Sequence, residues 1–203
     1  MWVILAWLMM QPSEITAWSI CAPLILEAGR KRGRLNIGAV FQPIELMHET
    51  LVNWFDIPKP KIAVCGLNPH ASENGQFGDE EERIISPAIF MAREQGIDVT
   101  GPYPPDTIFL KAKTGVYDAV VAMYHDQGLI PVKLLAFDEA VNCTIGLPII
   151  RTSPDHGTAF DIVGRNKANP GSMRAAISLA IDMAVKKHHR KEAERKASGK
   201  VKE

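Results

Sequence analysis

The 203-residue chain lacks three patterns that would each place it in a known class. It has no Gly-x-Gly-x-x-Gly segment, which excludes the Rossmann mode of dinucleotide binding. It has no Cys-x-x-Cys pair, which excludes the common zinc and redox motifs. Its N-terminal apolar run, residues 1–10, lacks the basic start of a signal peptide and is too short to span a bilayer. We therefore expect no membrane partner.

The chain also has no net charge and few cysteines. Because the formal net charge is zero, we expect no nucleic-acid partner. Residues 186–203 carry eight Lys or Arg against three Glu and no aromatic residue, which indicates a solvated helix end. The three cysteines, Cys21, Cys65 and Cys143, are far apart, which is typical of reduced thiols in a cytoplasmic protein. We expect each to be a small core residue rather than a nucleophile.

Apolar runs that alternate with helical spacings predict an α/β fold in which helices flank a sheet. The expected strands are 61–67, 118–124, 132–137 and 144–150, and the expected helices are 44–55, one that begins near residue 79, and one that begins at Ser172. We divide the chain into an atypical apolar segment (1–34) with two buried elements and a basic loop, an α/β domain (35–187) and a basic tail (188–203).

Two of the expected helices carry further detail. The four acids at 79–82 are interpreted as the solvated first turn of a helix, where negative charge is favoured. Pro87 predicts a kink, or a second helix that starts there. The final helix is expected to bury the apolar face made by Met173, Ile177, Ala180 and Ala184.

The segment 151–170, RTSPDHGTAFDIVGRNKANP, is the strongest candidate for a binding loop. It is polar, it is punctuated by glycine, and it follows an apolar run that we expect to be a buried strand. Open α/β sheets place their ligand sites in such loops at strand ends. The alternative is an ordinary surface connection.

This loop closely resembles the adenosine-binding loop of the isocitrate and isopropylmalate dehydrogenase superfamily. Residues 60–187 resemble the 4-hydroxythreonine-4-phosphate dehydrogenase family of pyridoxine biosynthesis. The resemblance rests on the motifs CGLNPHA (65–71), PPDTIF (104–109), MYHDQG (123–128), VKLLAFDEAVN (132–142) and GLPIIRTS (146–153), in that order, with the loop. It implies an α/β fold like that of isocitrate dehydrogenase, with a mixed sheet flanked by helices. It also implies that the chain is N-terminally truncated relative to the family. The family usually has Gly-Glu-Gly-Gly where this chain has Ser72-Glu73-Asn74-Gly75.

Two histidines follow expected strands, and imidazole is a common ligand of divalent metals, although such a histidine is often simply hydrogen-bonded. The resemblance implies that His70 and His125 bind a divalent metal (zinc, magnesium or cobalt). It matches Asp106 and Lys133 to catalytic residues and Lys133, Asn142 and Arg151 to substrate-binding residues. A Lys and an Arg suit a phosphate monoester. It matches the NAD or NADP site to His156, Gly157, Thr158, Ala159, Asp161 and Asn169.

The implied activity is metal-assisted, NAD(P)-dependent oxidation of 4-phosphohydroxy-L-threonine to 2-amino-3-oxo-4-phosphooxybutanoate with decarboxylation, in pyridoxal phosphate biosynthesis. The implied assembly is a homodimer with a shared active site. The family's N-terminal half, which carries a third metal-binding histidine in a Gly-His-Thr-Glu segment, has no match in the chain. The alternatives are a dehydrogenase of another phosphorylated hydroxy acid, such as a threonate or erythronate phosphate, and a non-catalytic homologue.

Overall fold

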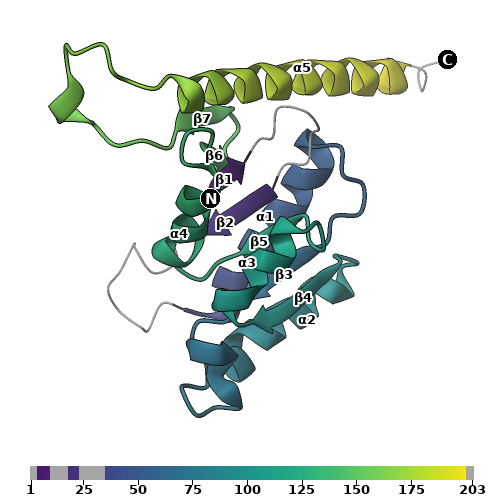
Figure 1. Ribbon diagram of the computed structural model, residues 1–203. Coiled ribbons are helices and arrows are strands. Elements are labelled where there is room, and N and C mark those ends of the chain that lie inside the picture. The colour runs from purple at the N-terminus through teal and green to yellow at the C-terminus, as the bar shows by residue number, and fades with distance from the viewer. Residues whose placement is uncertain (1–3, 10–17, 23–34, 200–203) are drawn as a thin grey trace.

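The computed structural model describes residues 4–9, 18–22 and 35–199, with the first two segments as backbone alone. Its centre is a seven-stranded mixed sheet in the order β4-β3-β5-β2-β1-β6-β7 (Figure 1). The strands are β1 (Ile4–Met9), β2 (Trp18–Ala22), β3 (Ile62–Cys65), β4 (Val99–Tyr103), β5 (Ala119–Val121), β6 (Val141–Ile145) and β7 (Arg151–Pro154).

Four neighbouring strands of the sheet are parallel, and the three strands beyond β2 alternate in direction. Strands β4, β3, β5 and β2 are parallel neighbours, whereas β1 is antiparallel to both β2 and β6, and β7 is antiparallel to β6. The mixed sheet expected from the sequence is therefore confirmed. The parallel half places the loops that follow β4, β3 and β5 at one edge of the sheet.

Helices cover both faces of this sheet. They are α1 (Ile37–Trp54), α2 (Ser86–Glu94), α3 (Pro105–Lys113), α4 (His125–Ala136) and α5 (Gly171–Gly199). Side chains of α1, α2 and α5 share the main core cluster with Ile62, Val64 and Cys143. Side chains of α3 pack with Ala63 and Cys65, on the opposite face of β3. Alternation along each strand thus serves two helical layers.

Helix α1 starts earlier than its apolar pattern indicated. The side chain of Asn36 caps it by accepting a 2.9 Å hydrogen bond from the backbone N–H of Ala39. The helix then continues through Pro43, which is buried. Gly38 and Pro43 both disfavour a helix interior. The apolar spacing therefore indicated a helix only from residue 44 onward.

The acidic run at 79–82 forms a helical turn, but one of its acids is not solvated. A π-helical turn spans Glu81–Ile85, and α2 begins at Ser86, as the Pro87 signal predicted. Glu81 is only 3% exposed, so our interpretation of this acid as a solvated residue is wrong. The reason is that its carboxylate accepts backbone hydrogen bonds from residues 67 and 68, far away in the sequence.

The expected strand 132–137 is wrong, because these residues lie at the end of helix α4. One stripe of this helix, Gln127, Gly128 and Val132, is buried against the sheet. Ala136 is half-buried, and the larger apolar side chains Leu134, Leu135 and Phe137 are exposed. A short apolar run fits a strand and a half-exposed helix equally well, so periodicity alone could not separate the two.

The expected strand 144–150 is also wrong in its bounds. Strand β6 ends at Ile145, and the chain turns at Gly146, whose φ of +81° favours glycine. Arg151 therefore does not follow an apolar strand. It begins β7 and pairs with Thr144 across the antiparallel ladder.

Helix α5 runs along the top of the molecule in Figure 1. Its buried stripe is Ala176, Leu179 and Met183, whereas Met173 and Ile177 are exposed, so the apolar face that we predicted is wrong. The helix is apolar on two sides, and packing on β6 and β7 selects one of them. It continues to residue 199, and residues 188–198 are exposed, in agreement with a solvated helix end. The division at residues 187 and 188 stays a prediction.

The two cysteines with described side chains are core residues. Cys65 and Cys143 are buried free thiols. Burial raises the pKa of the Cys143 thiol to about 11 and raises that of Cys65 further. Both are therefore poor nucleophiles, as we expected. The side chain of Cys21 lies outside the described residues. No helix in the described part of the chain is long and apolar enough to cross a membrane.

Candidate active site

Three predicted site residues lie at the same edge of the sheet. Strands β4, β3 and β5 are parallel neighbours, and their following segments carry Asp106, His70 and His125, respectively. Asp106 lies in the first turn of α3, His70 in a short helical segment (Pro69–Glu73), and His125 at the first residue of α4. The residues thus come from adjacent loops, as a site between them requires.

The two histidines differ in their surroundings. His125 is half-buried, and its Nδ1 lies 2.8 Å from Oδ1 of Asp126. A carboxylate on one ring nitrogen is the arrangement that orients imidazoles for metal binding. His70 is exposed, with its ring 6.3 Å from that of Phe77.

This pair of imidazoles fits a divalent cation in its donor chemistry. Within the described residues, however, no group of three His, Cys, Asp or Glu side chains could hold a metal ion.

The segment that carries His70 has an unusual backbone. Residues 70–74 all have positive φ, with values of 53°, 55°, 70°, 46° and 57°. Ser72 and Asn74 are non-glycine residues at two positions where the resembling family usually has glycine. The departure from the family motif thus falls at left-handed positions, where a side chain costs free energy.

Lys133, Asn142 and Arg151 lie on one side of the sheet. The side chains of Val141, Cys143 and Ile145 face the α1–α5 layer, so the alternate residues Asn142 and Thr144 face the opposite layer, where α4 carries Lys133. Arg151 is on this side as well, because its Nη1 donates a 2.7 Å hydrogen bond to Oγ1 of Thr144.

The polar atoms of this group differ in their surroundings. Within the described residues, the buried Oδ1 of Asn142 has no hydrogen-bond partner, which is uncommon for a buried polar atom. Nζ of Lys133 lies 3.4 Å from Oδ2 of Asp155 and 5.5 Å from the centre of the Phe137 ring. Lys133 is thereby held next to the 156–169 loop.

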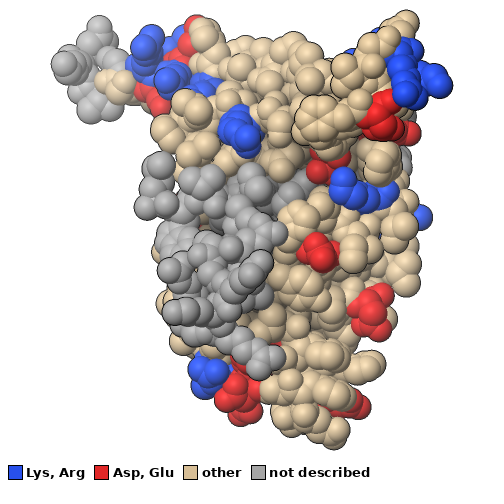
Figure 2. All heavy atoms as spheres, turned by 90° about the vertical axis from the view of Figure 1, so that its left-hand side faces the viewer, with Lys and Arg blue, Asp and Glu red and all other residues tan. Residues whose placement is uncertain are grey.

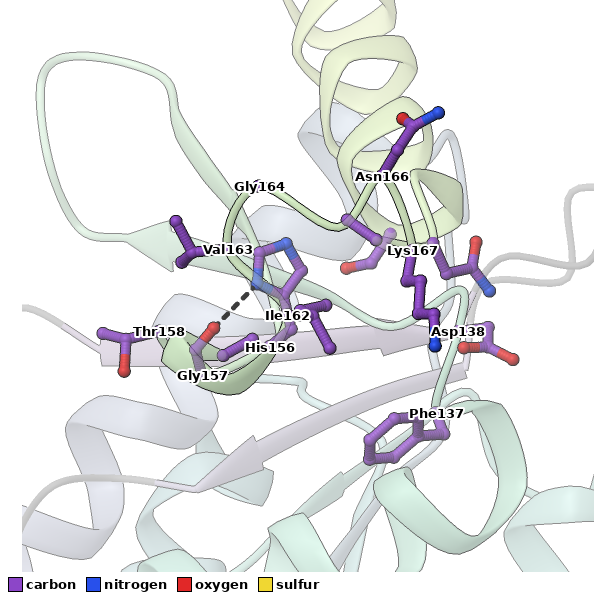
Figure 3. Close-up of a pocket in the computed structure, with 14 residues that line it drawn as sticks. Phe137, Asp138, His156, Gly157, Thr158, Ile162, Val163, Gly164, Asn166 and Lys167 are labelled. Atoms are coloured by element: carbon purple, nitrogen blue, oxygen red, sulfur yellow. Dashed lines mark hydrogen bonds between the residues drawn. The ribbon is translucent and has the colours of Figure 1, made fainter.

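The 156–169 loop encloses a pocket of about 670 Å³, a size typical of small-ligand sites. Figure 3 shows His156, Gly157 and Thr158 on one side of it and Asp138 and Lys167 on the other. Ala159 and Asn169 also line it, so five of the six predicted cofactor residues come together here. Asp161 lies on the short helix Phe160–Ile162 and does not line it.

A second hollow, of about 430 Å³, lies between α3 and α4. Asp106 and Asp126 line it together with apolar side chains, of which Leu110 is 67% and Leu134 is 81% exposed. Figure 2 views the side of the molecule on which α4 lies, and its described surface is largely uncharged, with charged side chains scattered across it.

Sequence reasoning missed three residues of this site. Asp155 had no predicted role, yet its Oδ2 lies 3.4 Å from Nζ of Lys133. Glu81 and Gln127 are buried and bind the backbone next to the two histidines. Glu81 lies in the acidic run 79–82 and Gln127 in the motif 123–128. The neighbouring residues in the sequence do not show, however, that this carboxylate and this amide are buried.

The chain is similar to known proteins over most of its length. It is 57% identical over 152 residues to a 4-hydroxythreonine-4-phosphate dehydrogenase of Desulforapulum autotrophicum, covering 75% of this chain and 45% of that protein. It is 64% identical over 126 residues to a D-threonate 4-phosphate dehydrogenase of Salmonella typhimurium, covering 62% of this chain and 38% of that protein. The chain therefore spans less than half the length of these relatives.

Solved structures agree with this similarity. A 4-hydroxythreonine-4-phosphate dehydrogenase from Klebsiella pneumoniae superposes with a TM-score of 0.71 at 44% identity, over 89% of this chain and 54% of that one. An isocitrate dehydrogenase from Methylococcus capsulatus, at 12% identity and a TM-score of 0.60, shares the fold over 92% of this chain and 59% of its own. Residues 32–180 match the family described as pyridoxal phosphate biosynthetic protein PdxA, and the chain belongs to that family.

Proposed function

We propose that the chain takes part in the NAD(P)-dependent oxidation of a small phosphorylated hydroxy acid. The observation that carries the proposal is the grouping of Lys133, Asn142 and Arg151 on one side of the sheet. Through Asp155, this group adjoins the 156–169 pocket. Basic side chains that border a pocket of about 670 Å³ suit an enzyme that moves a hydride from a phosphorylated substrate to a cofactor.

Each side chain has a proposed task. Arg151 supplies a forked pair of donors and Lys133 a compact charge for the anionic groups of the substrate. Asn142 adds a neutral amide, and its Oδ1 gains the hydrogen bond that it lacks in the described structure. Asp106 accepts the proton of the reacting hydroxyl, a role open to an exposed carboxylate at this edge of the sheet.

The proposed cofactors are NAD or NADP and a divalent cation. The dinucleotide would lie against His156, Gly157, Thr158, Ala159 and Asn169 in the 670 Å³ pocket, with Asp161 close by, and accept the hydride. A cation held by His70 and His125 would lower the pKa of the substrate hydroxyl.

Two substrates are candidates. The first is 4-phosphohydroxy-L-threonine, whose oxidation and decarboxylation would serve pyridoxal phosphate biosynthesis, as the names of several relatives imply. The second is a threonate phosphate, which is favoured by the 64% identity to the D-threonate 4-phosphate dehydrogenase. The two substrates differ in having an amino group or a hydroxyl next to the carboxylate.

Turnover of each substrate by the purified chain, with NAD and with NADP, tests the proposal. Reduction of either cofactor with one substrate at a rate abolished by Arg151→Ala would support it. Dinucleotide binding without turnover of either substrate would indicate that the chain is a non-catalytic homologue. Absence of dinucleotide binding would refute the assignment of the 156–169 pocket.

We also propose a homodimer with a shared active site. The α3–α4 hollow borders Asp106, and its rim is apolar, so a second copy would cover it. Light scattering should give a dimer for the wild type and a monomer for Leu134→Glu. The control is Val116→Glu, an exposed apolar position that does not line the hollow. A monomeric wild type would refute the dimer.

A further inference from the structure

Asp155 contacts the ammonium group of Lys133 with two of its oxygen atoms. Nζ of Lys133 donates a 3.3 Å hydrogen bond to the backbone carbonyl oxygen of Asp155 and lies 3.4 Å from Oδ2 of its carboxylate. An ammonium group has three N–H donors, so these two contacts leave one of them for a ligand. The side chain of Lys133 is 38% exposed, whereas that of Asp155 is only 12% exposed. The lysine is therefore accessible from one side and held from the other.

A buried serine fixes the backbone of Asp155. Ser172 lies in the first turn of α5 and is 4% exposed. Its Oγ accepts a 2.9 Å hydrogen bond from the N–H of Asp155 and donates a 2.6 Å hydrogen bond to the carbonyl oxygen of Ala140, just before β6. Asp155 is thus tied to a helix and, through Ser172, to the start of a strand. The two oxygen atoms that meet Lys133 consequently have a defined position.

The aromatic ring of Phe137 restricts Lys133 further. Nζ of Lys133 lies 5.5 Å from the centre of this ring, within the range of a cation–π contact. A lysine side chain is long and flexible, and fixing it when a ligand binds costs conformational entropy. Because Asp155 and Phe137 hold the ammonium group before a ligand arrives, the ligand does not have to order it.

The residues that hold Lys133 also border the cofactor pocket. Asp155 directly precedes His156, and His156, Phe137 and Ser172 all line the pocket of about 670 Å³. Phe137 and His156 are labelled in Figure 3. The lysine that we assign to the substrate is therefore positioned by the same part of the chain that surrounds the space assigned to the dinucleotide.

We propose that Asp155 is a positioning residue that holds Lys133 for the phosphorylated substrate next to the cofactor pocket. The inference rests on the proposed function, because it requires Lys133 to bind an anionic group. Asp155 itself does not touch the substrate. The alternative is that its carboxylate competes with the substrate for the lysine. Positioning is favoured because the carboxylate is largely buried and its backbone is fixed, so an anion meets Lys133 on the exposed side.

A double-mutant cycle tests whether Asp155 acts through Lys133. The four proteins are the wild type, Asp155→Asn, Lys133→Met and the double variant, each as the full chain. Calorimetry measures the affinity for inorganic phosphate, and urea unfolding measures stability. Asp182→Asn is the matched control, because it makes the same change at an exposed carboxylate of α5.

We expect Asp155→Asn to weaken phosphate binding by about 5-fold when Lys133 is present and to have no effect in the Lys133→Met background, since residues in one network are not additive. The control should bind phosphate like the wild type. Ser172→Ala is a second variant, which releases the backbone of Asp155 but keeps its carboxylate. It should weaken phosphate binding as well, again only when Lys133 is present, and it carries the test if Asp155→Asn does not fold.

Several results would overturn the inference and leave the proposed function intact. Wild-type phosphate affinity in a folded Asp155→Asn variant would make the contact purely structural. Tighter phosphate binding would show that the carboxylate competes with the anion. An equal loss with and without Lys133 would show that Asp155 acts by another route. A different result separates the proposed function itself: if Lys133→Met binds phosphate like the wild type, the assignment of Lys133 to the substrate is wrong, and the positioning role is lost with it.

Discussion

Arg151 donates a 2.7 Å hydrogen bond through Nη1 to the buried hydroxyl of Thr144, on the paired strand β6. This bond orients the guanidinium on the side of the sheet that carries Asn142. Within the described residues Arg151 makes no ion pair, and we propose that its charge binds an anionic group of the substrate. We predict that Arg151→Lys weakens binding of the substrate or of inorganic phosphate by about 1–3 kcal/mol, with little change in stability.

Titration calorimetry with phosphate and urea unfolding together check this prediction. Arg174→Lys is a suitable control, because Arg174 is an exposed residue of α5. A variant that loses stability but binds phosphate normally would show that Arg151 is a structural residue and that the substrate assignment is wrong.

Ser72 is predicted to cost the protein stability. Its φ is +70°, and a Cβ in this region is unfavourable by about 1–2 kcal/mol. Glycine removes that cost, but it gains chain entropy in the unfolded state and loses the long 3.3 Å hydrogen bond that Oγ of Ser72 accepts from the N–H of Gly75. That N–H keeps its bond to the carbonyl oxygen of residue 72, so Ser72→Gly should stabilise the protein by a net of about 0.5 kcal/mol. Asn74→Gly should gain less, because asparagine tolerates the left-handed region. Urea unfolding of both variants tests this prediction. A Ser72→Gly variant that is less stable than the wild type would contradict backbone strain at residue 72.

Cysteine ionisation should lower stability at alkaline pH. The folded pKa of Cys143 is raised to about 11 by burial, whereas an unfolded thiol has a pKa of about 8.5. Below pH 8.5 the proton is bound in both states. Between about 8.5 and 11 only the unfolded state loses it, so the free energy of unfolding falls with rising pH, by up to about 1.4 kcal/mol per unit for this thiol.

Unfolding measured from pH 7 to pH 10 checks this window. Cys143→Ala should show a shallower fall than the wild type over the same range. Equal slopes for the two proteins would mean that the Cys143 thiol ionises equally well in the folded state.

Much of the parallel half of the fold was predictable from sequence. Strands β3 and β5 are continuous apolar runs buried on both faces, so their hydrophobicity alone located them. Residues 132–137 were misassigned because α4 keeps apolar side chains such as Leu134 on its exposed side. That exposure breaks the amphipathic pattern that identifies a helix, and only the tertiary structure shows it.

The residues of the candidate site were likewise predictable only in part. The histidines and the 156–169 loop stand out by residue type and motif, whereas Glu81 looked like one of four solvated acids. Its burial depends on the N–H groups of Leu67 and Asn68, which only the fold brings to it. The contact between Lys133 and Asp155 likewise joins a helix to a strand end that short-range patterns cannot relate.

Gly157 offers a test of the cofactor pocket that leaves stability unchanged. A Cβ there would meet no atom within 4 Å, and its backbone is outside the left-handed region. Gly157→Ala and Gly157→Val should therefore unfold like the wild type. Because Gly157 lines the 670 Å³ pocket, the added carbons would occupy space that the cofactor needs. We expect NAD(H) affinity to fall in the order Gly, Ala, Val, by roughly tenfold for valine, or about 1.4 kcal/mol.

Fluorescence titration with NADH measures the affinities, and urea unfolding measures stability. Gly164→Ala is the matched comparison, because Gly164 lines the same pocket but has a φ of +74°. That variant should lose about 1 kcal/mol of stability through backbone strain. If Gly157→Val unfolds normally and binds NADH as tightly as the wild type, the cofactor does not lie against Gly157, and the 156–169 pocket has another ligand.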